Sequence, residues 1–156
     1  MQDTELLSQL AEDIGNAKRL LDLIDQEYQA LAERDLAGLE ALLTQKQTTL
    51  ALLGQHGARR SQALRQAGVT SDMDGMKAYA GRSSCGAALL DNARQLEELL
   101  EACRQSNERN GKLIRANQTA VGGMLRILKG SADTPDLYDR RGSASKSTYH
   151  RPLSQA

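Results

Sequence analysis

The sequence contains no phenylalanine and no tryptophan, and tyrosine occurs at only four positions. Leucine, a strong helix former, is abundant, whereas the aromatic and β-branched residues that favour strands are scarce. Proline occurs only at Pro135 and Pro152, so proline interrupts no helix before residue 130. These absences favour an all-α protein over a sheet-based fold.

Net charge and long apolar runs are also missing. The 20 basic and 20 acidic residues cancel, so no global field draws the chain to nucleic acid or to an anionic membrane. No apolar run approaches the roughly 20 residues that span a bilayer, and the N-terminus lacks the basic-then-apolar pattern of a secretion signal. Cys85 and Cys103 show no metal-ligand spacing. We expect two reduced thiols in the cytoplasm, no membrane insertion, no metal and no cofactor.

Apolar residues recur at alternating steps of three and four, the repeat of helices packed side by side in a bundle. Asp35 is expected to cap a second helix, so that the first two helices form an antiparallel hairpin. The predicted seam of the first helix comprises Leu7, Leu10, Ile14, Ala17, Leu21, Ile24, Tyr28 and Leu31. The predicted seam of the second helix comprises Leu36, Leu39, Leu43, Lys46, Leu50 and Leu53.

The apolar pattern of the second seam then ends, because Gly57 and Arg60 occupy positions where apolar side chains are expected. We interpret GQHGARR, residues 54–60, as a soft, exposed or bent extension of the helix, since helical glycines are unfavourable. Residues 68–86 are predicted to be a connection. In it, Ser71 to Asp74 fits a capping start for a short helix through about Tyr79, and GRSSCG is typical of a flexible loop.

The last long helix, about residues 87–129, has the most regular pattern. Its seam comprises Leu89, Ala93, Leu96, Leu100, Cys103, Asn107, Asn110, Ile114, Asn117, Val121, Met124 and Leu128. Asn110-Gly111 is a strong turn signal, but the seam keeps its phase on both sides, which predicts a continuous helix. We therefore predict one domain, residues 1–130, an antiparallel bundle of three long helices and one short helix with coiled-coil-like packing. A mobile C-terminal tail, residues 131–156, is expected to follow.

Signals for catalysis or for nucleic-acid binding are weak. GRSSCG lacks the Lys-Ser/Thr of a phosphate loop. His56 and His150 have no Cys, Asp or Glu partner at ligand spacing, so we expect both to be solvated. The basic clusters Arg59-Arg60-Arg65 and Arg140-Arg141-Lys146-Arg151 lack interleaved aromatic residues. We expect no catalytic residues and no nucleic-acid partner.

The C-terminal part of the last helix is a candidate binding surface. This helix, of about 43 residues, should outrun neighbours of about 30 residues by several turns, and an uncovered apolar stripe usually marks a partner site. Its two adjacent apolar rows are Ile114, Val121, Leu128 and Leu113, Ala120, Ile127. The asparagines on the stripe either fix the register of packed helices or pair with a partner's backbone. The residues alone leave both interpretations open.

The pattern N-x-x-N-G-x-L-I-x-x-N resembles the signature of FlgN-type flagellar export chaperones. Its residues here are Asn107, Asn110, Gly111, Leu113, Ile114 and Asn117. The run from Arg34 to Lys46 and the tail element DLYDRRG are similar to the same family. Gly122-Gly123, within the last helix, departs from some of its members.

This resemblance implies a cytoplasmic, ATP-independent chaperone of type III flagellar secretion. The implied clients are hook-associated junction proteins, FlgK- or FlgL-like, bound through C-terminal helical segments and delivered to the cytoplasmic domain of the export gate. The implied client-binding residues are Asn107, Asn110, Gly111, Leu113, Ile114, Asn117, Ala120, Val121, Met124, Leu125, Ile127 and Leu128. The implied gate-docking residues are Leu137 and Tyr138. The alternative is a self-associating coiled-coil scaffold without a secretion client; a weak homo-oligomer is compatible with either.

Overall fold

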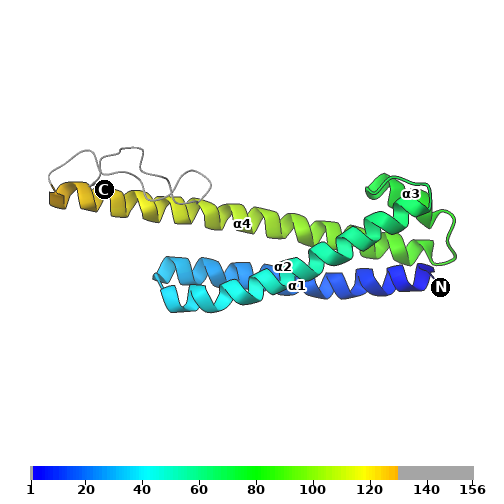
Figure 1. Cartoon of the computed structure of the whole chain (residues 1–156), viewed down its shortest axis with the longest axis horizontal. Helices are drawn as coiled ribbons and strands as arrows, with labels where there is room; N and C mark the ends of the chain where they lie inside the picture. Colours follow the sequence, from blue (N-terminus) through cyan, green and yellow to red (C-terminus); the bar gives the residue numbers. More distant parts are fainter. Residues whose placement is uncertain (1, 130–156) are drawn as a thin grey trace. The chain divides into compact units, whose positions relative to one another are not determined.

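The structure, a computed structural model, describes residues 2–129, except for the side chains of residues 120–122, 125 and 127–129. Within residues 2–129 the chain forms four helices (Figure 1): α1 (Gln2–Glu33), α2 (Leu36–Gln66), α3 (Met73–Ala80) and α4 (Gly86–Lys129). The predicted all-α bundle of three long helices and one short helix is confirmed. The predicted tail, residues 131–156, lies outside the described residues.

Contacts divide the chain into two units, Met1–Asn107 and Glu108–Ala156. The first unit contains α1, α2, α3 and the N-terminal half of α4, whereas the described part of the second unit is the C-terminal half of α4. The division therefore falls inside a helix. The predicted domain boundary near residue 130 stays a prediction.

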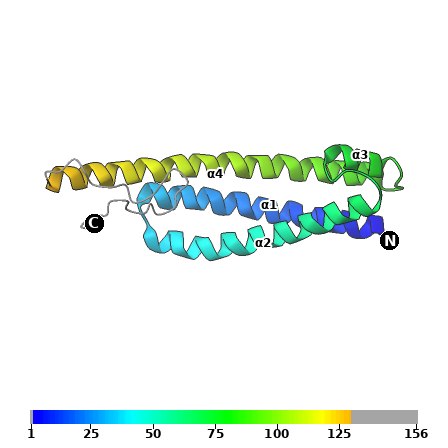
Figure 2. The ribbon, with the colours of Figure 1, turned by 45° about the horizontal axis from the view of Figure 1, so that its top comes forward.

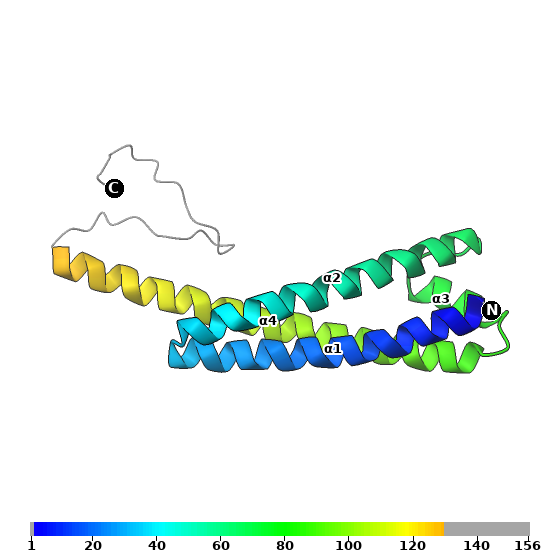
Figure 3. The same ribbon diagram turned by 60° about the horizontal axis from the view of Figure 1, so that its bottom comes forward.

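α1 and α2 form an antiparallel hairpin, as Figures 2 and 3 show. At its turn, Arg34 takes a left-handed conformation with φ 57°, and the Asp35 N–H donates to the Ala30 carbonyl at 2.8 Å. The Asp35 carboxylate accepts from the Gly38 N–H at 2.9 Å, which satisfies one of the free amides in the first turn of α2. The predicted cap and hairpin are confirmed.

α1 buries most of its predicted seam, but α2 does not. Leu36, Leu43 and Leu50 are 77%, 50% and 48% exposed, so their prediction as core residues is wrong. Of the predicted seam, Leu53 is buried, and the other residues that α2 buries are Leu42, Thr49, His56 and Leu64. Both rows have the spacing of a helix face, and periodicity alone favours the one richer in leucine.

A polar cluster explains why α2 packs through this face. Asp13 of α1 is 0% exposed; its carboxylate lies 2.6 Å from Nδ1 of His56 and accepts a hydrogen bond from Arg60. Asn16 donates to the same carboxylate at 3.3 Å. Since a buried charge is tolerated only when it is paired and hydrogen-bonded, the three side chains depend on one another. The interpretation of His56 as solvated is therefore wrong. Gly54, Gln55, Ala58 and Arg59 are exposed as expected, but His56 and Arg60 hold this segment to α1.

α3 begins with a cap one residue later than predicted. The carboxylate of Asp72, not the side chain of Ser71, accepts from the Gly75 N–H at 2.9 Å. A Cβ at Gly75 would lie 1.6 Å from the carbonyl oxygen of Thr70. Glycine is thus required where the chain passes close to the first turn of this helix.

Asp3 links the start of α1 to α3 and to the loop that follows it. The hydroxyls of Ser83 and Tyr79 each donate to the Asp3 carboxylate at 2.5 Å. The hydrogen bond from Ser83 makes the largest contribution to a lowered pKa of Asp3, followed by the bond from Tyr79. In turn, the bond to Asp3 raises the pKa of Tyr79 to about 12. Both shifts favour an ionised Asp3 beside a protonated Tyr79. The loop GRSSCG, predicted to be flexible, is anchored through Ser83.

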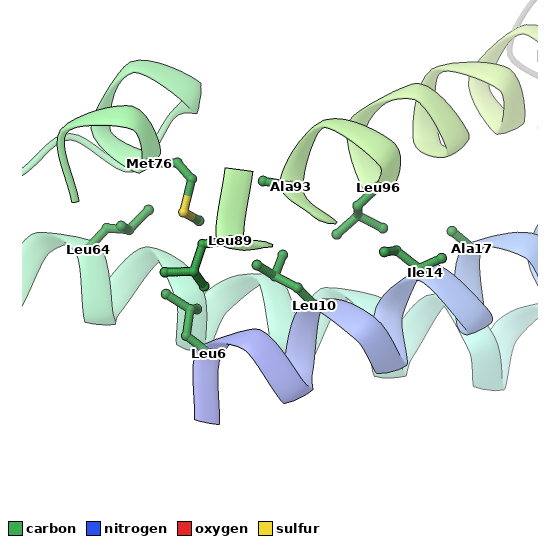
Figure 4. Close-up of a cluster of buried hydrophobic side chains, with 9 residues drawn as sticks. All are labelled: Leu6, Leu10, Ile14, Ala17, Leu64, Met76, Leu89, Ala93 and Leu96. Atoms are coloured by element: carbon green, nitrogen blue, oxygen red, sulfur yellow. The ribbon is translucent and has the colours of Figure 1, made fainter. Parts of the chain in front are cut away.

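The main apolar cluster of the first unit lies between all four helices, next to α3 (Figure 4). Its buried members are Leu6, Leu10, Ile14, Ala17, Leu64, Met76, Leu89, Ala93 and Leu96. A second cluster contains Leu20, Ile24, Leu53 and Cys103. Burial raises the pKa of the Cys103 thiol, which makes the thiolate scarce and the group unreactive. Cys85 and Cys103 are both free thiols.

Candidate functional site

α4 passes through Asn110-Gly111 without a break. The predicted continuous helix is therefore confirmed, and a hairpin corner at this dipeptide is excluded. The continuity matters for the candidate client surface, because residues three and four apart on one helix share a face. Leu113, Ile114 and the residues that follow at this spacing thus lie along one side of the C-terminal half of α4.

The asparagines differ in their surroundings. Asn107 is exposed, but its side-chain oxygen accepts from Nζ of Lys46 at 3.0 Å. Asn110 is only 1% exposed, and its oxygen accepts from the Arg109 side chain at 3.1 Å. Asn117 is half-buried. Asn110 is thus a buried, hydrogen-bonded group, and its contact with a partner stays a prediction.

The apolar residues of the predicted surface are described in part. Leu113 and Ile114 are half-buried, as is Gly111 between them and Asn110. Met124 is 61% exposed. Ala120, Val121, Leu125, Ile127 and Leu128 lie on α4, but their side chains are outside the described set. Leu137 and Tyr138, the predicted gate-docking residues, lie outside the described residues altogether.

The C-terminal half of α4 is also strongly basic, which the sequence analysis missed. Between residues 109 and 129 there is no Asp or Glu. The exposed cations of this stretch are Arg109, Lys112, Arg115 and Arg126. The balanced charge of the whole chain concealed this segregation, although a count along the last helix would have found it.

A second feature of the surface lies on α2 and on the helices around its C-terminal half. The outward leucines Leu36, Leu43 and Leu50 form a row along the N-terminal half of the helix. Beside the C-terminal half there is a cavity of about 520 Å³, at whose edge lie Gly57 and Ser61. Its lining is mixed. The charged members are Arg60, Asp72, Glu97, Glu101 and Arg104, and the apolar members include Leu10, Leu64, Met73, Met76, Leu96 and Leu100.

The described part of the chain contains neither a metal site nor a membrane-spanning helix. No group of three or more His, Cys, Asp or Glu side chains among the described residues is arranged to hold a metal ion. Within the same residues, no helix is long and apolar enough to cross a bilayer.

The described residues form a helical bundle, and its candidate binding sites are exposed faces of long helices. The sequence matches the FlgN protein family over residues 1–146. A crystal structure of a protein from Pseudomonas aeruginosa, described as a flagella synthesis protein FlgN, is similar to this chain with a TM-score of 0.68 and 46% identity. The alignment covers 80% of this chain and 95% of that chain. A search of curated proteins found no match.

The chain belongs to the FlgN family. The resemblance carried by residues 107–117 is thereby confirmed, and the family supports a flagellar chaperone-like role.

Proposed function

We propose that this protein is a cytoplasmic export chaperone that binds C-terminal helical segments of hook-associated proteins and delivers them to the flagellar export gate. The proposed client surface is the C-terminal half of α4. The observation that carries this assignment is Met124, which is 61% exposed on a helix that continues to Lys129. A large apolar side chain that is exposed to water on a regular helix is typical of a surface that a partner covers.

The state of the asparagines narrows the proposed surface. Asn107 and Asn110 already have partners within the chain, so we assign them to packing. Recognition then falls to Leu113, Ile114 and Asn117 together with Met124 and the apolar residues around it. An amphipathic helix with anchors at steps of three and four fits such a surface.

The charge of this half-helix supports a client segment that carries acidic residues beside its apolar row. Lys112, Arg115 and Arg126 are exposed, and residues 109–129 contain no Asp or Glu. Opposite charges accelerate association and are screened by salt. We therefore expect the association rate with a client to fall as ionic strength rises.

Calorimetry with the C-terminal segment of a hook-associated protein tests the client assignment. We expect Met124→Asp to weaken binding by at least about tenfold, because it places a charge in an apolar contact. Ile114→Asp and Val121→Asp should act in the same direction and leave helicity nearly intact. Thr119→Asp, at an exposed position about 140° from Met124 around the helix, is the control. Binding that none of the first three variants alters would reject this surface.

Gate docking is assigned to Leu137 and Tyr138 in the segment after α4. We expect Tyr138→Ala to leave client affinity unchanged and to weaken binding to the cytoplasmic domain of the export gate. An equal loss of both interactions would refute this division. If the chain alone forms a tight dimer through the C-terminal half of α4 and binds no client, the scaffold interpretation holds instead.

A further inference from the structure

The outward face of α2 carries large side chains at one end and borders a cavity at the other. Leu36, Leu43 and Leu50 are 77%, 50% and 48% exposed, and their spacing of seven residues places them on one row of the helix. The same row continues through Gly54 to Gly57 and Ser61, and the last two line the cavity of about 520 Å³. Exposed leucines and a cavity with a partly apolar lining therefore follow one another along a single helix.

Charge is depleted on this face. Lys46 is the one charged residue between positions 41 and 58, and its Nζ lies 3.1 Å from the Glu27 carboxylate within the same chain. A helix face that meets only water usually carries Lys and Glu, whereas the core of a protein interface is depleted of charge. The composition of the face is that of an interface.

At two glycines on the same row, this chain has room for a larger side chain. A Cβ at Gly54 would meet nothing within 4 Å, and a Cβ at Gly57 would meet only the Arg60 side chain, at 3.7 Å. Each glycine costs about 1 kcal/mol relative to alanine inside a helix. Close approach of another chain accounts for both positions, because only glycine presents bare backbone there.

We propose that a second copy of this chain docks on this face, with the two α2 helices antiparallel across a two-fold axis near Leu50. Residues whose numbers add to about 100 then lie opposite each other, as a two-fold contact requires. Leu43 of each copy meets Gly57 of the other, and Leu36 enters the cavity beside Ser61. Parallel pairing would instead place leucine against leucine and glycine against glycine, and would leave both cavities unfilled.

The charges at the two ends of α2 agree with the antiparallel arrangement. Within residues 35–66, the acidic residues are Asp35 and Glu40, and the basic residues after Lys46 that are not already paired with Asp13 are Arg59 and Arg65. Antiparallel pairing brings the acidic end of each helix to the basic end of the other, whereas parallel pairing brings like charges together. Size and charge thus point to the same occupant, a second α2.

Sedimentation velocity across a concentration series tests the association. We expect the wild-type chain to form a dimer, and Leu43→Asp to weaken its Kd by at least about 100-fold, because each dimer loses the leucine twice. Ala41→Asp is the matched control: it adds the same charge at an exposed site about 200° away around the helix. Circular dichroism verifies that both variants stay helical. A chain that is monomeric at every concentration, or a Leu43→Asp dimer as tight as wild type, overturns the proposal.

Disulfide cross-linking tests the direction of pairing, in a background with Cys85→Ser and Cys103→Ser. Ala51→Cys lies next to the proposed axis and should give a covalent dimer on mild oxidation. Glu40→Cys should not, because the two copies of this position are about 30 Å apart along an antiparallel pair. Cross-linking of both variants indicates parallel pairing and overturns the arrangement. A monomeric wild type whose client binding is abolished by Leu43→Asp would assign this face to the client instead.

Discussion

α1 and α2 lie side by side in one hairpin, yet they contribute to it differently. α1 buries ten residues, of which only Asp13 is charged or polar. α2 buries five residues, of which Thr49 and His56 are polar. At the same time α2 exposes the three leucines Leu36, Leu43 and Leu50 to solvent. The polarity of α2 is thus partly inverted, with polar groups inside and apolar groups outside.

His56, Arg60 and Lys46 of α2 have partners on α1, and Thr49 donates to the Gln45 carbonyl of its own helix at 2.9 Å; these bonds make the inversion tolerable. His56 and Arg60 share Asp13, and Lys46 bonds to Glu27 at 3.1 and 3.2 Å. Buried polar groups without such partners would destabilise the fold by more free energy than the packing of the helices contributes. The outward leucines have no such explanation within the hairpin, and the proposed docking of a partner would account for them.

The largest expected effect comes from removal of the shared carboxylate. Asp13→Ala leaves His56 and Arg60 without their acceptor, and we expect the free energy of unfolding to fall by about 3–5 kcal/mol. Urea denaturation followed by circular dichroism measures the loss. Glu12→Ala, at an exposed neighbouring position, should change it by less than about 0.5 kcal/mol. Should Asp13→Ala fail to fold, Asp13→Asn retains part of the hydrogen bonding and should show a smaller loss of the same sign. Equal stability of all these variants would mean that the cluster does not hold the hairpin.

A pair of leucine substitutions tests the two helices against each other. Leu20→Ala in α1, at a position 3% exposed, removes core packing and should cost about 2–5 kcal/mol. Leu43→Ala in α2, at a position 50% exposed, should cost less than about 1 kcal/mol at a protein concentration low enough for a monomer. The same denaturation assay compares the two directly. Similar losses would show that Leu43 is covered within the single chain and that α2 is not inverted.

The smallest effect is expected at Lys46. Its side chain is 15% exposed and that of Glu27 is 17% exposed, so the double replacement Lys46→Met with Glu27→Met exchanges an ion pair for packing. We expect a change of at most about 1 kcal/mol of either sign, since a buried pair and an apolar substitute are often nearly equivalent. Glu27→Met alone should be worse than the double variant, because it leaves the ammonium of Lys46 without a carboxylate. Additive effects in this double-mutant cycle would contradict the coupling.

Local signals were sufficient for the elements of the fold. The Asp35 cap, the short connection after α1 and the uninterrupted seam of α4 each depend on residues within a few turns of one another. For that reason they could be predicted without knowledge of the tertiary contacts. The family signature in residues 107–117 is equally local. The basic residues after Asn107 were readable in the same way, although the whole-chain balance hid them.

The packed face of α2 could not be predicted locally. Its leucine row and its polar row both have helical spacing, and the choice between them depends on Asp13, 43 residues before His56. The burial of Asn110 is a similar case, because an asparagine at a seam position fits packing and recognition equally well. Residues alone left that question open, and the structure adds that this side chain is only 1% exposed, which favours packing.

The sequence by itself determined that this chain is helical, where its helices begin and end to within a residue or two, and to which family it belongs. These depend on propensity, capping and periodicity, which act over one or two turns. Only the tertiary structure decided which face of α2 lies inside, because that face is stable only while an acidic residue of another helix pairs with its imidazole and guanidinium. It also decided which leucines remain in water. Burial depends on how the helices pack together, so the sequence of one helix does not determine it.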